Sequence, residues 1–327
     1  MKSLVEDAAA LVSLSPVLSP VRRRALRGTT NIVYYHYIGP DVPYYADFAT
    51  GCTLERFAQD LETLREHFRF ASLAQVIAGR DDAKKPLLAL TFDDGFDLIA
   101  SGVADVLELY GATATTFVIT SCIDNEALMW RNKLSVIRAL VDESVYVARY
   151  NELMRERGYP PVARGRMLQA ASLAWPAGEK DELADALWAS CDLPPVATVL
   201  AEYRPYFTWE GLERWLERGH DVGLHTATHP MCSRLDAAGI HAEIVEPAQL
   251  LRRRLGLESV PFSYPFGRRL PEAVERELYE QGVFSCAVGI NGFAAVATPP
   301  YRLERACAEQ GLGLSVFGRA LLGPAAA

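Results

Sequence analysis

The chain has 327 residues, half of them hydrophobic and 23% charged, and its formal net charge is −8 at pH 7. This composition excludes a disordered protein, and the length fits one large α/β domain or two ordinary ones. The charges form no long run of one sign, so the sequence lacks the basic stripe of a nucleic-acid-binding protein. We therefore expect a globular protein with no nucleic-acid partner.

The cysteines and the N-terminal segment bear on the cellular compartment. Six scattered cysteines form no C-x-x-C pair, which is typical of reduced thiols and not of a disulfide framework. The apolar run AAALVSLSPVL stands before the basic cluster Arg22, Arg23 and Arg24, which is the wrong order for a secretory signal, and it is too short to span a membrane. We expect a cytoplasmic protein with no transmembrane segment, although the same run also suits a peripheral helix at the inner face of the membrane.

In chain order, residues 1–30 are predicted to form a helical segment and residues 31–327 a single α/β domain. Within this domain, short runs of β-branched residues alternate with stretches of helical period. The runs NIVYYHYI, LLALTF and ATTFVI predict strands, and TLERFAQDLETLREH and DLIASGVADVLELYG predict the helices between them. This alternation is typical of βα units in a parallel sheet or barrel.

Residues 121–206 interrupt the alternation. They contain several helical segments separated by YPP, WPAGE and DLPP, with no convincing strand between them. We interpret them as a helical insertion and hypothesise that it forms a lid over a pocket. The alternation then resumes, and strands are predicted at DVGLH, SVPFSYPFG, FSCAVG and YRLERAC.

Two adjacent carboxylates, Asp93 and Asp94, stand at the end of the predicted strand LALTF and before Gly95. Because side chains alternate along a strand, neighbouring acids at its tip can have different roles. One can bind a metal while the other takes a proton from water. A helix N-cap or a turn is the purely structural alternative for so short a motif.

Two histidines, His225 and His229, follow the predicted strand DVGLH in the sequence GLHTATHP. A spacing of four residues lets one helical turn aim both rings the same way. Two imidazoles and one carboxylate form a three-ligand set for a divalent ion such as Zn²⁺. Each histidine alone also fits a core role, but together with the acid pair at another strand tip the pattern predicts a metal site.

The sequence SYPFG, residues 263–267, predicts a tight turn after another strand. Such a turn can direct a backbone N–H, that of Phe266, at an oxyanion. A turn inside a buried core is the alternative interpretation of this short motif.

The three motifs TFDDG, HTATH and YPFG resemble those of the carbohydrate esterase family 4 polysaccharide deacetylases, also called the NodB homology domain. The resemblance extends over residues 31–120 and 207–310. It implies a distorted (β/α)7-type barrel and metal-dependent removal of an acyl group from a sugar amide. The roles that it implies are general base for Asp93, metal ligand for Asp94, His225 and His229, and oxyanion binding for Phe266.

The sequence departs from the family pattern at the third motif. There the family has an arginine that holds the catalytic aspartate, whereas this chain has Ser263. Arg302 and Arg305, in the predicted strand YRLERAC, are the candidates to replace it, and Arg305 is preferred. Ordinary surface positions are the alternative for both arginines.

The family's usual general acid, a histidine on the last strand, is also missing, because no histidine follows His241. Some members of the family are circularly permuted, with this strand at the N-terminus and a tyrosine-histidine sequence in it, and YYHYI resembles that form. We therefore interpret His36 as the acid that protonates the leaving amine. A core histidine bonded to a backbone carbonyl is the alternative.

The sequence thus predicts a hydrolase of linear amide bonds that removes an acetyl or formyl group from an amino sugar. The expected substrate is an N-acylated glycan precursor or small glycoconjugate, and the expected metal is Zn²⁺, with Co²⁺, Ni²⁺, Mn²⁺ and Fe²⁺ as alternatives. A deformylase or other non-sugar amidohydrolase, and a non-catalytic sugar-binding protein, are the alternative functions. The sequence leaves the oligomeric state open.

Overall fold

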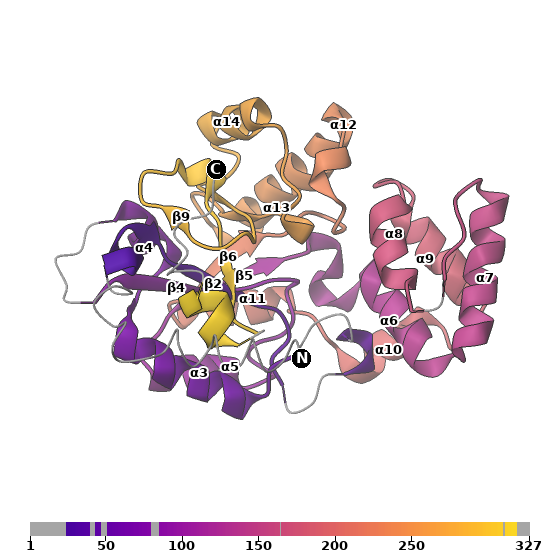
Figure 1. The fold of residues 1–327 in the computed structure, drawn as a ribbon, viewed down its shortest axis with the longest axis horizontal. Coiled ribbons are helices and arrows are strands. Elements are labelled where there is room, and N and C mark those ends of the chain that lie inside the picture. The colour runs from indigo at the N-terminus through magenta and orange to yellow at the C-terminus, as the bar shows by residue number, and fades with distance from the viewer. Residues whose placement is uncertain are drawn as a thin grey trace.

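The computed structural model of the protein describes residues 24–39, 43–46, 51–79, 85–163, 165–309 and 311–318. The strands in these ranges are β1 (Thr29–Thr30), β2 (Ile32–Tyr35), β3 (Arg69–Phe70), β4 (Leu87–Phe92), β5 (Ala114–Val118), β6 (Asp221–Leu224), β7 (Phe262–Ser263), β8 (Ala287–Val288), β9 (Ala294–Ala295) and β10 (Ala306–Cys307). One curled parallel sheet has the strand order β10-β2-β4-β5-β6-β7-β8, with β3 paired to the start of β4 (Figure 1). The strands β1 and β9 form a separate antiparallel pair.

The two edges of the curled sheet are linked by the segment that ends in β10. Ala306 of β10 is in register with Val33 of β2, and Leu303 makes a parallel bridge to Val288 of β8. The predicted fold class, an α/β protein with a distorted (β/α) barrel, is confirmed. The strand before His36 lies between β10 and β4, while the circular permutation of the chain stays a prediction.

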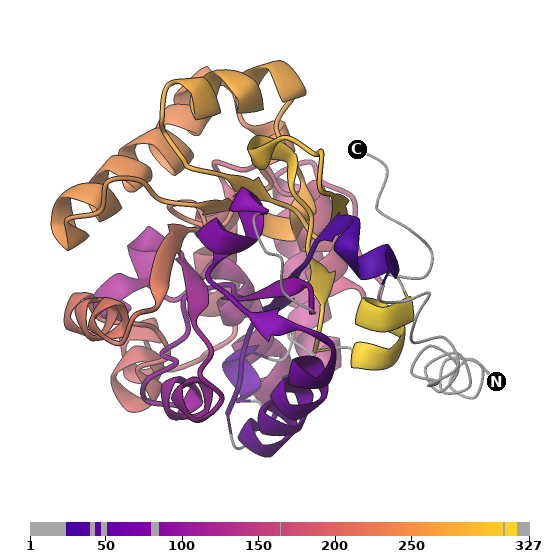
Figure 2. The ribbon, with the colours of Figure 1, turned by 90° about the vertical axis from the view of Figure 1, so that its left-hand side faces the viewer.

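Helices cover the outside of the sheet (Figure 2). They are α3 (Leu54–His67), α5 (Val103–Leu109), α11 (Trp209–Glu217), α12 (Ala237–Ile240), α13 (Glu246–Leu255) and α14 (Glu272–Glu280). The short helix α4 (Leu73–Ala78) instead places Leu73 and Val76 in a cluster with Ile32 and Leu87, near the starts of β2 and β4. A π-helical turn, His241–Val245, connects α12 to α13. The helix α3 begins after the N-cap Thr53, whose hydroxyl accepts a hydrogen bond from the Arg56 N–H at 3.1 Å.

Alternation along β4 separates the outer core from the interior of the barrel. The residues of β4 in the main hydrophobic core under the helices are Leu88, Leu90 and Phe92. Ala89 belongs instead to a second buried cluster, with side chains of β2, β5 and β8. Thr91 and Asp93 continue the series that starts at Ala89, so the strand pattern directs Asp93 into the carboxyl end of the barrel.

Five helices between β5 and α11 interrupt the βα alternation. They are α6 (Trp130–Leu140), α7 (Glu143–Glu156), α8 (Met167–Ala174), α9 (Lys180–Ala189) and α10 (Val196–Tyr203). They stand beside the barrel around a hydrophobic core that includes Leu134, Tyr150 and Leu187 (Figure 1). The strands β5 and β6 still pair directly, so the sheet continues where these helices leave it. The boundaries 121–206 and the function as a lid stay predictions.

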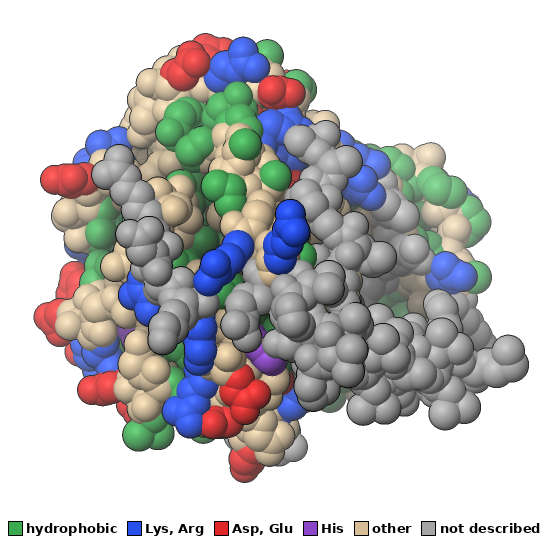
Figure 3. Space-filling model, turned by 60° about the vertical axis from the view of Figure 1, so that its left-hand side comes forward, with side chains coloured by type: hydrophobic (Ala, Val, Ile, Leu, Met, Phe, Trp, Pro, Cys, Tyr) green, Lys and Arg blue, Asp and Glu red, His purple; other side chains and the backbone are tan. Residues whose placement is uncertain are grey.

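Three further expectations concern the N-terminus, the surface and the thiols. Of the predicted helical segment 1–30, residues 1–23 lie outside the described part of the chain, and residues 24–27 are helical. Over the described ranges, no helix combines the length and the apolar character that a bilayer crossing requires. Basic and acidic side chains are both spread over the face shown in Figure 3. All six cysteines are free thiols, and all but Cys307 are buried.

Candidate active site

The two adjacent acids take different positions at the carboxyl end of β4. Asp93 is 3% exposed, and Asp94 is 1% exposed and has a left-handed backbone with φ of 69°. Gly95 also has a φ of 69°, and a Cβ at this position would lie 3.1 Å from Cα of Val118 in β5. Glycine is therefore required where the turn passes close to the neighbouring strand.

Arg305, the preferred of the two candidate arginines, holds Asp93. Its Nη1 donates to Oδ1 of Asp93 at 2.8 Å, and its Nη2 donates to Oδ2 at 2.7 Å. The remaining donors bind the Thr91 hydroxyl, the Ser263 hydroxyl and the Gly289 carbonyl, so all five N–H groups of the guanidinium are used. Ser263, which occupies the family's arginine position, thus supplies a hydroxyl to the network that a distant arginine completes.

Arg305 is fully buried between two aromatic rings. Its Cζ lies 4.8 Å from the ring centroid of Tyr34 and 5.3 Å from that of Phe117. Arg302 lies elsewhere and pairs with Glu275 at 3.1 Å. The fold therefore brings Arg305, and not Arg302, to Asp93.

The protonation state of Asp93 is set by its partners. Burial alone would raise its pKa, but the Arg305 guanidinium outweighs burial and holds the pKa of Asp93 well below its usual range. His225 and His36 lower it further. Asp93 is therefore an ionised carboxylate at neutral pH, with an orientation fixed by a bidentate ion pair.

Asp94 lies with His225 and His229, the residues predicted to bind a metal. Nε2 of His225 is 3.5 Å from Oδ1 of Asp94, and Nε2 of His229 is 3.4 Å from the same oxygen. One ligand atom from each residue lies within 4.8 Å of the others, and all three residues are buried. Ligands of a tetrahedral ion at about 2.0–2.2 Å are about 3.3–3.6 Å apart, so the two spacings fit a site for Zn²⁺ or a similar ion.

Hydrogen bonds within this cluster leave the atoms that face one another available. Nδ1 of His225 lies 2.8 Å from the carbonyl oxygen of Ser263, so Nδ1 carries the proton and Nε2 presents its lone pair toward Asp94. Oδ1 of Asp94 is buried and accepts no hydrogen bond. A buried carboxylate oxygen without a donor is costly unless a cation binds it, so these residues fit a divalent ion.

Burial disfavours the charged forms of Asp94 and His229. It raises the pKa of Asp94, with His36 and His225 opposing it and Asp93 adding to it. Burial also lowers the pKa of His229 far below its usual value, and His225 adds to that effect. His229 is therefore a neutral imidazole, which is the form that binds a metal.

Backbone strain is concentrated at this site. Half of the non-glycine residues with a positive φ in the described ranges belong to it: Asp94, Thr226, His229 and Phe266, with φ of 69°, 67°, 62° and 58°. Such conformations cost roughly 1–3 kcal/mol each and gather where function requires them. The loop of residues 225–229, here named the metal loop, contains two of the four.

Phe266 lies in the predicted turn after β7. The hydrogen bonds that close the turn come from the N–H groups of Gly267 and Arg268, so they do not use the N–H of Phe266. The Phe266 ring centroid is 4.9 Å from that of His229. The turn therefore does not use the Phe266 N–H for its own hydrogen bonds, and the Phe266 ring lies against the metal cluster.

His36 follows β2 and contacts a carboxylate instead of a backbone carbonyl. Its Nδ1 lies 3.0 Å from Oε2 of Glu309, and its backbone N–H donates to the other oxygen of Glu309. The imidazole is about a quarter exposed. Burial lowers the pKa of His36, but Glu309, together with Asp94 and Asp93, raises it to about 9. His36 is therefore a protonated and oriented imidazole at neutral pH, as a general acid must be.

Three residues that complete the site were not predicted. Glu309 is one, and it follows Arg305 by four residues, in the same strand phase, which was a readable signal. Glu243 accepts two N–H groups of the metal loop at 3.0 and 2.9 Å, and the Trp130 indole N–H donates to the carbonyl of His229 at 3.0 Å. These two belong to helical segments in which no local pattern points to the site.

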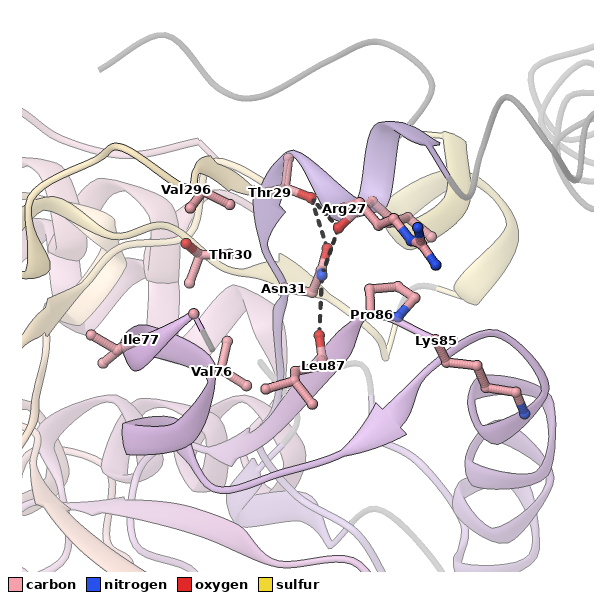
Figure 4. Close-up of a pocket in the computed structure, with 12 residues that line it drawn as sticks. Arg27, Thr29, Thr30, Asn31, Val76, Ile77, Lys85, Pro86, Leu87 and Val296 are labelled. Carbon is pink, nitrogen blue, oxygen red and sulfur yellow. Dashed lines mark hydrogen bonds between the residues drawn. The ribbon is translucent and has the colours of Figure 1, made fainter. Parts of the chain in front are cut away.

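A cavity of about 350 Å³ lies at the opposite end of the sheet, where β2 and β4 begin (Figure 4). In its wall, the Asn31 amide donates to the carbonyls of Leu26 and Leu87 and accepts the Thr29 hydroxyl, at 2.8–3.0 Å. None of the predicted site residues lines this cavity. The predicted site residues therefore do not share this cavity, which lies at the amino ends of the strands.

Comparisons with known proteins give the family. A family model described as polysaccharide deacetylase matches residues 80–159 and 165–282, more than half of the chain, whereas no curated protein matches it. The solved Streptococcus pyogenes deacetylase PplD in complex with acetate is similar, with 17% identity, a TM-score of 0.54 and coverage of 85% of this chain and 91% of that chain. The structure of IcaB from Ammonifex degensii is also similar, with 17% identity, a TM-score of 0.52 and coverage of 89% and 97%.

At these identities the structural likeness shows the fold alone, whereas the family model gives the reaction class. The resemblance seen in the three motifs is thereby confirmed. The chain belongs to the polysaccharide deacetylase family and is a hydrolase that acts on the amide bonds of acetylated sugars.

Proposed function

We propose that this protein is a metal-dependent deacetylase that removes the N-acetyl group of an amino sugar. The observation that carries the proposal is one buried constellation in which three metal-type ligands stand beside an ionised carboxylate. Its members are Asp94, His225, His229 and Asp93. A binding protein without chemistry gains nothing from burying these charges together, so the non-catalytic alternative loses its support.

Asp94, His225 and His229 would hold the ion, and Zn²⁺ suits two imidazoles and one carboxylate, with Co²⁺, Ni²⁺, Mn²⁺ and Fe²⁺ as alternatives. When bound, such an ion polarises the amide carbonyl and lowers the pKa of water. The contact of His225 with the Ser263 carbonyl keeps its ring in the ligating orientation.

Asp93 acts as the general base and takes the proton of the attacking water. Its low pKa keeps it ionised, and its ion pair with Arg305 keeps it oriented. A carboxylate has about four lone-pair sites; Arg305 takes two, and the Ser263 hydroxyl donates its one hydrogen at 3.3 and 3.4 Å from the two oxygens, so one site remains for the incoming proton. Arg305 is therefore a positioning residue for the base.

Phe266 and His36 act on the acyl group and on the leaving amine. The backbone N–H of Phe266 stabilises the oxyanion of the tetrahedral intermediate. His36, kept protonated and oriented by Glu309, gives its proton to the amine nitrogen as the C–N bond breaks. The products are a carboxylate, acetate for an N-acetyl substrate, and a free amino sugar.

The substrate that we propose is a cytoplasmic glycan precursor or small glycoconjugate that carries an N-acetyl group. Family membership supports the sugar amide. The free and mostly buried cysteines, typical of a reducing compartment, support an intracellular substrate.

Metal content and amine release test the proposal together. The purified protein should carry a divalent ion and release amine from N-acetylated amino sugars, and Asp94→Ala and His225→Ala should lose both properties. His241→Ala is the matched control, because His241, on the π-helical turn, is exposed and pairs with Glu246 of α13. Equal metal in the wild type and both site variants would overturn the assignment, and amine release from N-formyl sugars alone would replace it with a deformylase.

A further inference from the structure

The insertion reaches the metal cluster at the first residue of α6. Trp130 is 2% exposed, and its indole N–H donates to the carbonyl oxygen of His229 at 3.0 Å. This is a bond from the insertion to the backbone of a metal-type ligand, across 99 residues of sequence. The group that fixes this ligand thus comes from outside the βα frame.

The same end of α6 contacts the turn that carries Phe266. The ring centroids of Trp130 and Phe266 are 6.3 Å apart. Arg131 makes a cation–π contact with the same Phe266 ring, with its Cζ 5.0 Å from the ring centroid. Since the Phe266 ring also contacts His229, three elements meet here: α6, the metal loop and the YPFG turn.

A second contact joins the insertion to the metal loop through α9. Lys180 is 4% exposed, and its Nζ donates to the hydroxyl of Thr228 at 2.6 Å. That hydroxyl donates to Glu243 at 2.5 Å, and Glu243 accepts the N–H groups of Ala227 and Thr228. Every residue from 227 to 229 therefore has a backbone or side-chain bond to a group outside the loop.

These contacts act where the backbone is strained. His229 and Phe266 hold φ of 62° and 58°, which L-residues adopt only when the surroundings over-determine them. For His229, the insertion supplies two such constraints. Trp130 binds the His229 carbonyl, and Lys180 binds the hydroxyl of the neighbouring Thr228. The His229 ring, whose Nε2 lies 3.4 Å from Oδ1 of Asp94, depends on the orientation of this backbone.

From this geometry we infer that the helical insertion is a brace for the metal site, with Trp130 and Lys180 as positioning residues that hold His229 in its ligating orientation. The inference goes beyond a lid, because it assigns the insertion a role in metal affinity before any substrate binds. It rests on the proposed metal site of Asp94, His225 and His229.

Titration with Co²⁺, followed by its visible absorption, tests the brace. Trp130→Phe keeps an aromatic ring and removes the N–H, and we expect Co²⁺ affinity to fall about tenfold, the lower end of the effect seen when groups that orient metal ligands are removed. Trp188→Phe is the matched control, since Trp188 is a buried tryptophan of the insertion whose N–H binds the Pro194 carbonyl at 2.9 Å, away from the metal loop. Its Co²⁺ affinity should equal that of the wild type.

Lys180→Met gives a second measurement that leaves Trp130 in place, and its Co²⁺ affinity should also fall. Lys133→Met is its control, because Lys133 is a buried lysine of α6 that pairs with Asp185 at 2.5 Å. Wild-type affinity in both Trp130→Phe and Lys180→Met would overturn the inference while leaving the metal site intact. Failure of the wild type itself to bind Co²⁺, or equal binding by Asp94→Ala, would overturn the proposed function and the brace with it.

Discussion

Two sites at opposite ends of the same parallel sheet differ in how their buried polar groups are bonded. At the amino end, Asn31 uses its amide against the carbonyls of Leu26 and Leu87, beside an open cavity (Figure 4). At the carboxyl end, Oδ1 of Asp94 and Nδ1 of His229 are buried without a hydrogen bond. Asn31 therefore uses its polar atoms within the fold, whereas Oδ1 of Asp94 is left to bind a ligand.

This difference shows that hollow space and chemical capacity are separate properties. Two polar side chains in the wall of the cavity at the amino end, Thr29 and Asn31, already make their hydrogen bonds within the protein, so a ligand would have to compete with these bonds. The carboxyl end holds ionisable groups with shifted pKa values and a strained backbone, which mark a functional site.

Of the variants predicted here, Asp93→Asn is expected to have the largest effect on activity. It removes the carboxylate that we propose as the base, so amine release should fall by about 10²–10⁴-fold while metal content is kept. Asp60→Asn is the control, because Asp60 is also buried and bonded, to the Tyr35 hydroxyl at 3.2 Å, but lies outside the site. Activity in Asp93→Asn close to that of the control would show that Asp93 is not the base.

A smaller effect on rate and a large one on stability are expected from Arg305→Met. Removing one partner of a buried ion pair costs about 3–5 kcal/mol of unfolding free energy at neutral pH. Because the pKa of Asp93 is lowered on folding, the ion pair stabilises the protein above the usual pKa of 3.8, and this contribution is lost as pH falls through the folded pKa. Denaturant unfolding at several pH values should therefore show the two proteins converging in acid.

The pH dependence of activity in Arg305→Met tests the same ion pair. Without the guanidinium, burial raises the pKa of Asp93, so the acid limb of the pH–rate profile should move to higher pH. The double variant Asp93→Asn with Arg305→Met should recover part of the stability and none of the activity. An acid limb that stays in place would show that Arg305 does not tune the base.

Glu309→Gln is expected to move the other limb of the profile. The charged and titratable groups that raise the pKa of His36 to about 9 are Glu309, Asp94 and Asp93, with Glu309 the largest, while burial lowers it. Loss of the Glu309 charge should therefore lower this pKa and shift the alkaline limb of kcat to lower pH. Glu304→Gln, which removes a carboxylate paired with Arg269 on the same segment, should leave the limb in place.

The linked stability has the opposite pH dependence to that of Asp93. Since the folded pKa of His36 lies above its usual 6.5, the His36–Glu309 pair stabilises the protein fully below about pH 6.5 and loses this effect as pH rises through about 9. The difference in unfolding free energy between wild type and Glu309→Gln should follow that window. A difference that grows with pH would contradict the pairing.

Strand alternation explains which parts of the site could be predicted from the sequence. Asp93 and His36 each follow a strand whose inward phase is readable, and the parallel sheet brings their carboxyl ends together. The two histidines of the metal loop were predicted from spacing, and Arg305 was preferred over Arg302 among the two candidates of one predicted strand. The alternation of strand and helix runs predicted βα units and the family resemblance implied the distorted barrel; this fold class is confirmed.

The unpredicted part of the site depends on contacts between distant segments. Glu309 meets His36 across 273 residues, and Trp130 meets His229 across 99, so neither pair has a local pattern. The positive φ of Phe266 likewise has no cue in the residue type, because glycine, asparagine or aspartate would be expected there. Such features require the assembled barrel and insertion.

The smallest effect on catalysis is expected at the amino end, from Asn31→Ala. The change leaves the carbonyls of Leu26 and Leu87 without their donors, which should cost about 1–3 kcal/mol of unfolding free energy. Asn31 stands five residues before His36, but its bonds face the cavity and not the metal cluster. Thermal unfolding should therefore shift while kcat and Co²⁺ affinity per folded molecule stay at wild-type values. A loss of kcat equal to that of the site variants would mean that the two ends of the sheet are coupled, and the separation of folding from chemistry drawn here would be wrong.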